Sequence, residues 1–388
     1  MKIAFFHNLP SGGALRALYE KIKLFESKGW HVSLYMLSTA EKDFLPLPLI
    51  SGELFEAQLS FSGISKWQRY RKASRLCADK INASGVDLVY VDKCRFLSAP
   101  TILRLLKKPT IFYLHEPLGI WEYSAKAIEN QHATSSLSRA FQKLSFFSKL
   151  KKIFSLPERL WIKFEDKRNV LSAKRVLTCS QFAQRWIERV YGIKAEVAYQ
   201  GVDANFFTAK NESVKKNQVL SVGRIESRKG HDFLIEVLAH IETKLRPVLV
   251  IACDAELESY KENLKRQASN RGVKIDIIYR PTQLELRNVY RQSLAVLCAG
   301  INEPFGLAPL EAGGCATAVI AIDAGGYRET VLHTQTGYLL PRDPAVWAKH
   351  ITSLMHDRAL AERLGDCGRI FVEREWTWQK FWDTVVKV

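Results

Sequence analysis

Strand-like and helix-like segments alternate along the whole chain. The strand-like segments are short apolar runs, and the segments between them carry apolar residues at helical spacing. Alternation of this kind is typical of parallel sheets covered by helices. The sequence therefore predicts an α/β protein.

The expected strands form two series, separated by a polar, weakly patterned stretch at residues 203–217. The first series is 2–7, 32–37, 87–91, 110–115, 175–179 and 196–199, with helices at about 14–28, 67–83 and 181–190. The second series is 219–222, 248–252, 274–278, 294–298 and 317–322. Because 388 residues exceed the usual size of one core, we expect two doubly wound, Rossmann-like domains, residues 1–203 and 204–375, with a ligand cleft between them.

The chain carries a net charge of +17, which attracts phosphate-bearing partners. Residues 121–175 hold twelve Lys and Arg against five Asp and Glu. Within this basic segment, apolar residues recur at three- and four-residue steps and predict an amphipathic helix at 137–156. Three interpretations stay open: packing on its own domain, docking on an anionic membrane surface, or nucleic-acid binding. Nucleic acid is the least favoured partner, because no recognition fold is visible.

The sequence has no apolar run of the roughly 18 residues needed to span a bilayer, and its N-terminus resembles a buried strand. We therefore expect a cytoplasmic protein, with peripheral attachment to the inner face of the cell membrane as an open alternative. Seven scattered cysteines show no C-x-x-C spacing, and no D-x-D pair is present in the second half of the chain. We expect no metal site.

Two loops have the composition of phosphate sites. Gly12 and Gly13 separate an expected strand from a helix, where free backbone N–H groups bind anions, although a plain tight turn is equally compatible. Arg224 and Lys229 flank the first strand–helix turn of the second series. Two cations that converge on a cleft can neutralise a diphosphate leaving group, and a solvated basic turn is the alternative.

The stretch from Glu303 to Glu311 places two carboxylates eight residues apart, the first before a glycine turn and the second on an expected helix. Such a pair can accept hydrogen bonds from a hydroxyl-rich ligand, or it can be two solvated acids. His115 ends an expected strand and precedes Pro117, so its ring should reach the cleft. A lone histidine is more often structural.

The Glu303–Glu311 stretch, followed by Gly325, Gly326, Arg328 and Glu329, resembles the retaining glycosyltransferases of family 4, which have the GT-B fold. The resemblance implies a C-terminal helix, residues 376–388, that crosses back to the first domain. It also implies catalytic or donor-facing roles for His115, Glu303, Arg224 and Lys229, and binding roles for Gly12, Gly13, Phe305, Gly306, Leu307 and Glu311. Gln200 stands where the family usually has Asn, which displaces the amide by about 1.5 Å.

The resemblance implies metal-independent transfer of a hexose from a UDP-, GDP- or ADP-sugar to a hydroxyl acceptor, with retention of configuration and without a cofactor. The acceptor would be a saccharide, a lipid-linked molecule or a protein, in the synthesis of a cell-surface polysaccharide, glycolipid or glycan. Two alternatives stay open. One is another GT-B reaction, such as that of a sugar phosphorylase or a nucleotide-sugar epimerase. The other is a non-catalytic protein that binds lipid or nucleic acid.

Overall fold

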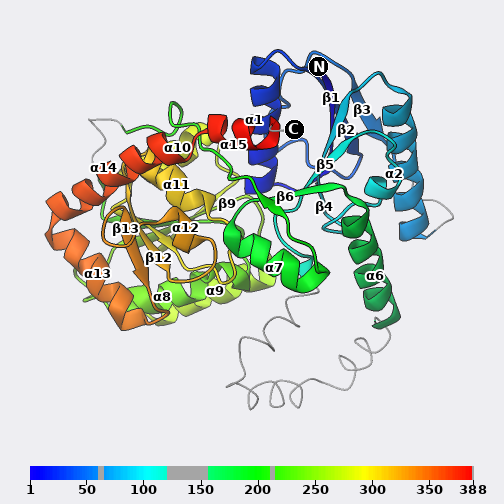
Figure 1. The fold of residues 1–388 in the computed structure, drawn as a ribbon. Coiled ribbons are helices and arrows are strands. Elements are labelled where there is room, and N and C mark those ends of the chain that lie inside the picture. The colour runs from blue at the N-terminus through cyan, green and yellow to red at the C-terminus, as the bar shows by residue number, and fades with distance from the viewer. Residues whose placement is uncertain (60–64, 120–155, 210–214, 387–388) are drawn as a thin grey trace.

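The computed structural model describes residues 1–59, 65–119, 156–209 and 215–386. The helix predicted at 137–156 lies outside these residues, apart from its last position. Within them the chain forms two parallel sheets, each covered by helices (Figure 1). The predicted fold class is therefore confirmed.

The first sheet has seven parallel strands in the order β3-β2-β1-β4-β5-β6-β7. Its strands are β1 (Lys2–Asn8), β2 (His31–Leu37), β3 (Leu54–Ala57), β4 (Leu88–Cys94), β5 (Thr110–Tyr113), β6 (Arg175–Thr178) and β7 (Glu196–Val197). The helical elements are α1 (Gly13–Ser27), α2 (Lys66–Ala83), the 3-10 turn η1 (Thr101–Arg104), α6 (Leu156–Ser172) and α7 (Gln181–Tyr191). In β1, Ile3 and Phe5 enter one apolar core while Ala4 and Phe6 enter the other, so this strand is buried on both faces.

The second sheet has six parallel strands in the order β10-β9-β8-β11-β12-β13. They are β8 (Gln218–Val222), β9 (Val248–Cys253), β10 (Ile275–Tyr279), β11 (Ala295–Cys298), β12 (Ala318–Ile322) and β13 (Gly337–Leu340). Its helical elements are η3 (Ser227–Lys229), α8 (His231–Ala239), α9 (Glu258–Asn270), α10 (Gln283–Gln292), α11 (Leu307–Gly314), α12 (Tyr327–Thr330), α13 (Pro344–His356) and α14 (Arg358–Glu375). We call the two sheets with their helices the first and second domains.

The last helix, α15 (Trp378–Val386), returns to the first domain, as the resemblance implied (Figure 1). Trp382 packs against Phe25 of α1 with ring centroids 4.9 Å apart. Arg175 of β6 donates hydrogen bonds to the carbonyl oxygens of Thr384 and Val385, at 2.8 and 2.6 Å. These contacts fix the helix on the sheet that begins the chain.

All eleven expected strands are present, but two edge strands, β3 and β13, were not predicted. Both have only four residues, and β3 is mostly half-exposed. A short edge strand has a neighbour on one side only, and its residues need not show the continuous apolar pattern of a central strand. None of the helices in the described part of the chain is long and apolar enough to cross a membrane.

Candidate active site

A cavity of about 240 Å³ lies between the two domains, at the carboxyl ends of both sheets. Nine of the ten predicted site residues line it: Gly12, Gly13, His115, Arg224, Lys229, Glu303, Phe305, Gly306 and Leu307. The tenth, Glu311, lines a smaller adjoining cavity, which shares Arg16, Gln283 and Leu307 with the first. The structure thus brings together residues that are up to about 300 positions apart in the sequence.

Two helix N-termini point at this cavity without a side-chain cap. Helix α1 begins after Gly12 and α11 begins after Gly306, and neither glycine can cap the first-turn N–H groups. Both glycines have positive φ angles, 127° and 102°. A Cβ at Gly306 would lie 2.9 Å from the ring of Tyr327, so a side chain has no room there. Free N–H groups from two helices make this wall of the cavity a site for anions.

Lys229 and Glu303 form an ion pair at the cavity wall, with Nζ 2.7 Å from Oε2. Burial alone would lower the pKa of Lys229, but the carboxylate of Glu303 raises it above its usual value. Lys229 is therefore protonated at neutral pH. Arg224 is exposed at the cavity, and its guanidinium makes no hydrogen bond or ion pair with the described residues. Its carbonyl oxygen lies 3.1 Å from Nε2 of the buried His231, which fixes the backbone at this turn.

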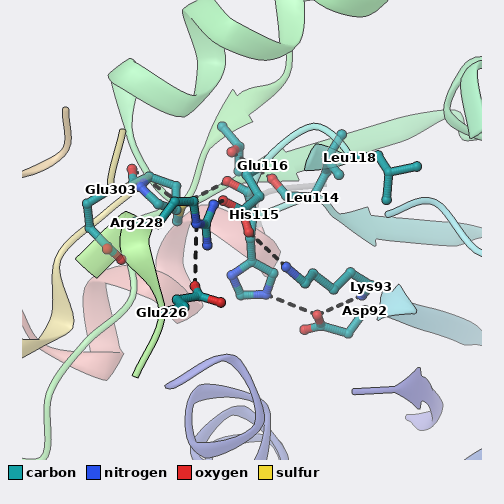
Figure 2. A network of polar contacts seen from close by, with 12 residues as sticks. Asp92, Lys93, Leu114, His115, Glu116, Leu118, Glu226, Arg228 and Glu303 are labelled. Atoms are coloured by element: carbon teal, nitrogen blue, oxygen red, sulfur yellow. Dashed lines mark hydrogen bonds and ion pairs between the residues drawn. The ribbon is translucent and has the colours of Figure 1, made fainter. Parts of the chain in front are cut away.

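Glu116 joins the two domains across the cleft (Figure 2). Its carboxylate lies 3.0 Å from Lys93 of the first domain and 3.3 Å from Arg228 of the second, and Arg228 also pairs with Glu226. Burial alone would raise the pKa of Glu116, but Lys93 and Arg228 lower it to about 2. Glu116 is therefore an anion at every physiological pH.

His115 is held as a neutral imidazole of defined tautomer. Its Nε2 lies 3.0 Å from Oδ1 of Asp92 (Figure 2), and its Nδ1 lies 3.4 Å from Nε2 of Gln200. Asp92 can only accept a hydrogen bond and the Gln200 amide donates one, so the proton is on Nε2. Burial lowers the pKa of His115, and Asp92 only partly offsets that effect.

Two charged residues behind His115 were not predicted from the sequence. Lys21 of α1 and Asp92 of β4 are fully buried, with Nζ 3.7 Å from Oδ2. Burial lowers the pKa of Lys21 to about 8. Burial alone would raise the pKa of Asp92, but His115 and Lys21 lower it to about 2. A sequence signal existed for Lys21, which falls at helical spacing with Leu18, Ile22 and Phe25 on the apolar face of α1.

Glu329, in the motif that follows the Glu303–Glu311 stretch, also bridges the domains. Its carboxylate accepts hydrogen bonds from the backbone N–H groups of Gln181 and Phe182, both at 2.9 Å, and from the hydroxyl of Tyr199 at 2.8 Å. Negative charge at the N-terminus of α7 is favourable. Ser180 caps the same helix through Ala183 N–H, and its hydroxyl donates across the cleft to the carbonyl oxygen of Pro304.

Glu311 is buried on α11 and already has two partners. The hydroxyl of Tyr290 donates to Oε2 at 2.6 Å, and NH1 of Arg16 lies 3.0 Å from Oε1. The nearby charge of Glu311 adds to burial in raising the pKa of Tyr290. Any hydroxyl ligand at Glu311 would therefore share or replace the contact with Arg16.

Two family models match the chain. The model for Glycosyltransferase Family 4 matches residues 11–206, which is half of the chain, and that for Glycosyl transferases group 1 matches residues 203–371. The chain belongs to glycosyltransferase family 4. This confirms the family that the Glu303–Glu311 stretch indicated.

Curated relatives resemble part of the chain. A D-inositol 3-phosphate glycosyltransferase from Streptomyces bingchenggensis is 33% identical over 171 residues, which cover 42% of this chain and 37% of the relative. An alpha-maltose-1-phosphate synthase from Mycobacterium tuberculosis is 30% identical over 235 residues, which cover 54% and 61%. The match thus spans less than two thirds of either relative.

Solved structures resemble the whole chain. A sucrose-phosphate synthase from Thermosynechococcus elongatus has a TM-score of 0.74 at 18% identity, and covers 98% of this chain and 96% of its own. Anabaena HepE, in complex with UDP, has a TM-score of 0.70 at 17% identity, and covers 100% and 99%. At this identity the likeness concerns the fold, which is that of GT-B glycosyltransferases.

Proposed function

We propose that this member of family 4 transfers a hexose from a nucleoside diphosphate sugar to a hydroxyl acceptor, with retention of anomeric configuration and without a metal ion. One observation carries the proposal: the free N-termini of α1 and α11, together with Arg224 and Lys229, face a single cavity between two parallel sheets. Backbone N–H groups and fixed cations are what a departing diphosphate needs.

Four of the lining residues have a part in this proposed reaction. The transition state has oxocarbenium character, and charge builds on the leaving phosphate, where Lys229 and Arg224 stabilise it. Glu303 accepts hydrogen bonds from hydroxyls of the donor sugar. The neutral ring of His115, held from behind by Asp92, shapes the pocket for the sugar without adding a positive charge next to an oxocarbenium centre.

The proposed route to retention is attack of the acceptor on the same face as the leaving group. Glu116 is paired with Lys93 and Arg228, and Glu303 with Lys229. Close cationic partners hold both carboxylates in place and offset their negative charge, which makes them weak nucleophiles. The acceptor proton then passes to the departing phosphate oxygen, and no covalent glycosyl-enzyme intermediate is required.

Thermal-shift and calorimetric titration with UDP-, GDP- and ADP-sugars tests the donor site. One donor should stabilise the wild type and Lys265→Ala, which replaces an exposed lysine on α9, and should stabilise Lys229→Ala less. A ligand at one hundred times its Kd stabilises a protein by about 2.7 kcal/mol, which is readily measured. Failure of every nucleotide sugar to bind at millimolar concentration would refute the proposal.

The acceptor panel can start from phosphorylated sugars, because the names of both curated relatives include a phosphorylated sugar or polyol. The anomeric configuration of the product, followed by NMR, tests retention, and turnover in the presence of EDTA tests metal independence. Cleavage of a saccharide by inorganic phosphate would instead favour a phosphorylase, and conversion of the nucleotide sugar without an acceptor would favour an epimerase.

A further inference from the structure

A second groove, of about 800 Å³, lies on the first domain, away from the cavity. It is formed by α2, η1 and α6. Its lining includes five basic side chains and one carboxylate, namely Arg71, Lys72, Arg75, Arg104 and Arg168 with Glu165. The groove is therefore strongly positive.

Glu165 compensates only part of this charge. It is buried, and its oxygens lie 2.6 Å from Arg104, 3.2 Å from Arg71 and 3.8 Å from Arg168. Lys72 and Arg75 are exposed and make no ion pair with the described residues. One carboxylate thus faces three guanidiniums while two further cations face solvent, and an anionic surface would complement them.

Beside the groove, α6 exposes an apolar stripe. Leu160, Phe164 and Leu171 are 58%, 59% and 53% exposed, and their spacing places them on one face of the helix. Lys167 is exposed on the same face. Side chains as large as these, gathered and open to solvent on one helix face, mark an interaction surface.

The stripe and the groove form one continuous surface, which we call the α6 surface. Arg168 joins them, because its guanidinium lies 5.2 Å from the ring centroid of Phe164 and 3.8 Å from Glu165. The opposite face of α6 is anchored, for example by Asn169, which donates to the carbonyl oxygen of Ala99 at 2.9 Å. In Figure 1, α6 projects downward from the first domain, apart from the second domain.

We propose that the α6 surface docks on an anionic lipid membrane. The leucines and Phe164 would enter the interface between headgroups and acyl chains, while Arg75, Lys72 and Arg168 lie against lipid phosphates. Charge complementarity indicates an anionic partner, and the apolar stripe selects a membrane over nucleic acid, which offers no apolar phase. The proposal uses only described residues and depends neither on the helix predicted at 137–156 nor on the proposed reaction.

Flotation with phosphatidylcholine vesicles, with and without 30% phosphatidylglycerol (on the order of natural anionic content), tests this surface. The wild type should bind only the anionic vesicles, less at high salt. Lys72→Ala/Arg75→Ala should weaken binding by roughly 25-fold at low salt, since each surface cation contributes about a fivefold factor. Leu160→Ser/Phe164→Ser should weaken it by about tenfold or more.

Matched controls lie on the second domain. Leu257→Ser/Ile370→Ser removes apolar side chains of similar exposure, and should bind as the wild type does. All variants should keep the wild-type melting temperature within about 3 °C, which shows that they are folded.

Five results would overturn the proposal, and the first four concern binding. They are equal binding to neutral vesicles, wild-type binding by both α6-surface variants, a shift from dimer to monomer in Leu160→Ser/Phe164→Ser without any vesicle binding by the wild type, and binding of RNA in place of vesicles. A large loss of thermal stability in the apolar variant would also overturn it, because the stripe would then be covered by the same chain.

Discussion

Replacing Asp92 by Asn tests whether the buried pair behind His115 stabilises the fold. Lys21 and Asp92 are both fully buried, with Nζ 3.7 Å from Oδ2. The Lys21 ammonium also lies 3.5 Å from the ring centroid of Tyr113. In Asp92→Asn that ring contact remains, but the carboxylate that faces the ammonium is gone.

The structure gives the size of the expected effect. The pKa of Asp92 is about 2 in the fold against 3.8 for a free carboxyl group. Since one pKa unit corresponds to about 1.4 kcal/mol, the ionised form contributes about 2–3 kcal/mol to the free energy of unfolding. Breaking one side of a buried ion pair typically costs about 3–5 kcal/mol. We expect a loss of about 3 kcal/mol for Asp92→Asn near pH 6.

The dependence on pH separates this effect from a simple packing defect. The pKa of Asp92 is lowered by folding, so its contribution is present above about pH 4 and is lost as pH falls toward 2. The pKa of Lys21 is also lowered, to about 8 from 10.5, so the folded state gains stability as pH rises through this interval. In Asp92→Asn the ammonium deprotonates at lower pH. The difference between the two proteins should therefore be largest at pH 5–7 and shrink on both sides.

Urea unfolding followed by tryptophan fluorescence at pH 4, 6 and 9 measures this difference. Asp79→Asn, an exposed carboxylate on α2, is the control and should leave stability within about 0.5 kcal/mol of the wild type. Lys21→Met/Asp92→Asn should recover part of the loss, because no buried charge remains unpaired. A loss below about 1 kcal/mol, a loss that is the same at all three pH values, or a double variant as unstable as the single one would refute the reasoning.

Three further substitutions test the site. Gly306→Ala should cost about 2 kcal/mol or more in thermal unfolding, because of its positive φ and its close approach to Tyr327, and a wild-type melting temperature would contradict this. Glu329→Gln should loosen the contact between the domains, which would increase the radius of gyration in X-ray scattering and lower the free energy of unfolding by about 1–2 kcal/mol. An unchanged radius and stability would contradict a bridging role for Glu329. Gln200→Leu removes the donor to Nδ1 of His115, so this nitrogen becomes free to take a proton, and NMR should show a higher pKa for His115. An unchanged pKa of His115 would mean that Gln200 does not set the tautomer.

The fold was predictable because a strand that is buried on both faces of its sheet has a recognisable apolar run in the local sequence. Central strands such as β1 carry a continuous apolar run, here residues 3–6, and the helices between them show apolar residues at helical spacing. Edge strands are under less of this constraint: β3 and β13 were missed, although the edge strands β7 and β10 were predicted. The helix predicted at 137–156 lies outside the described residues apart from its last position, so it stays a prediction.

The site was predictable where its residues are close in sequence and follow a pattern. The glycines of the first loop and the Arg224 and Lys229 pair follow strands at known positions, so topology alone places them at one edge of a sheet. Residues that are distant in sequence and come into contact only in the folded protein show no such local pattern. Lys21 meets Asp92 across 71 positions, and Glu329 reaches the start of α7 across 148. Their roles depend on burial and on partners that only the packing of distant elements brings together.

The pairing of charges in the cleft bears on how a donor would be recognised there. Glu303 holds Lys229, and Glu311 holds Arg16. A diphosphate at Lys229 or a ribose hydroxyl at Glu311 would exchange one partner for another, so the net gain from each contact is small. The free N–H groups of α1 and α11 have no side-chain cap to give up. Within the described residues, these N–H groups and the unpaired guanidinium of Arg224 therefore offer a donor the larger net stabilisation, whereas Lys229 serves mainly to orient its phosphates and to stabilise their charge during transfer.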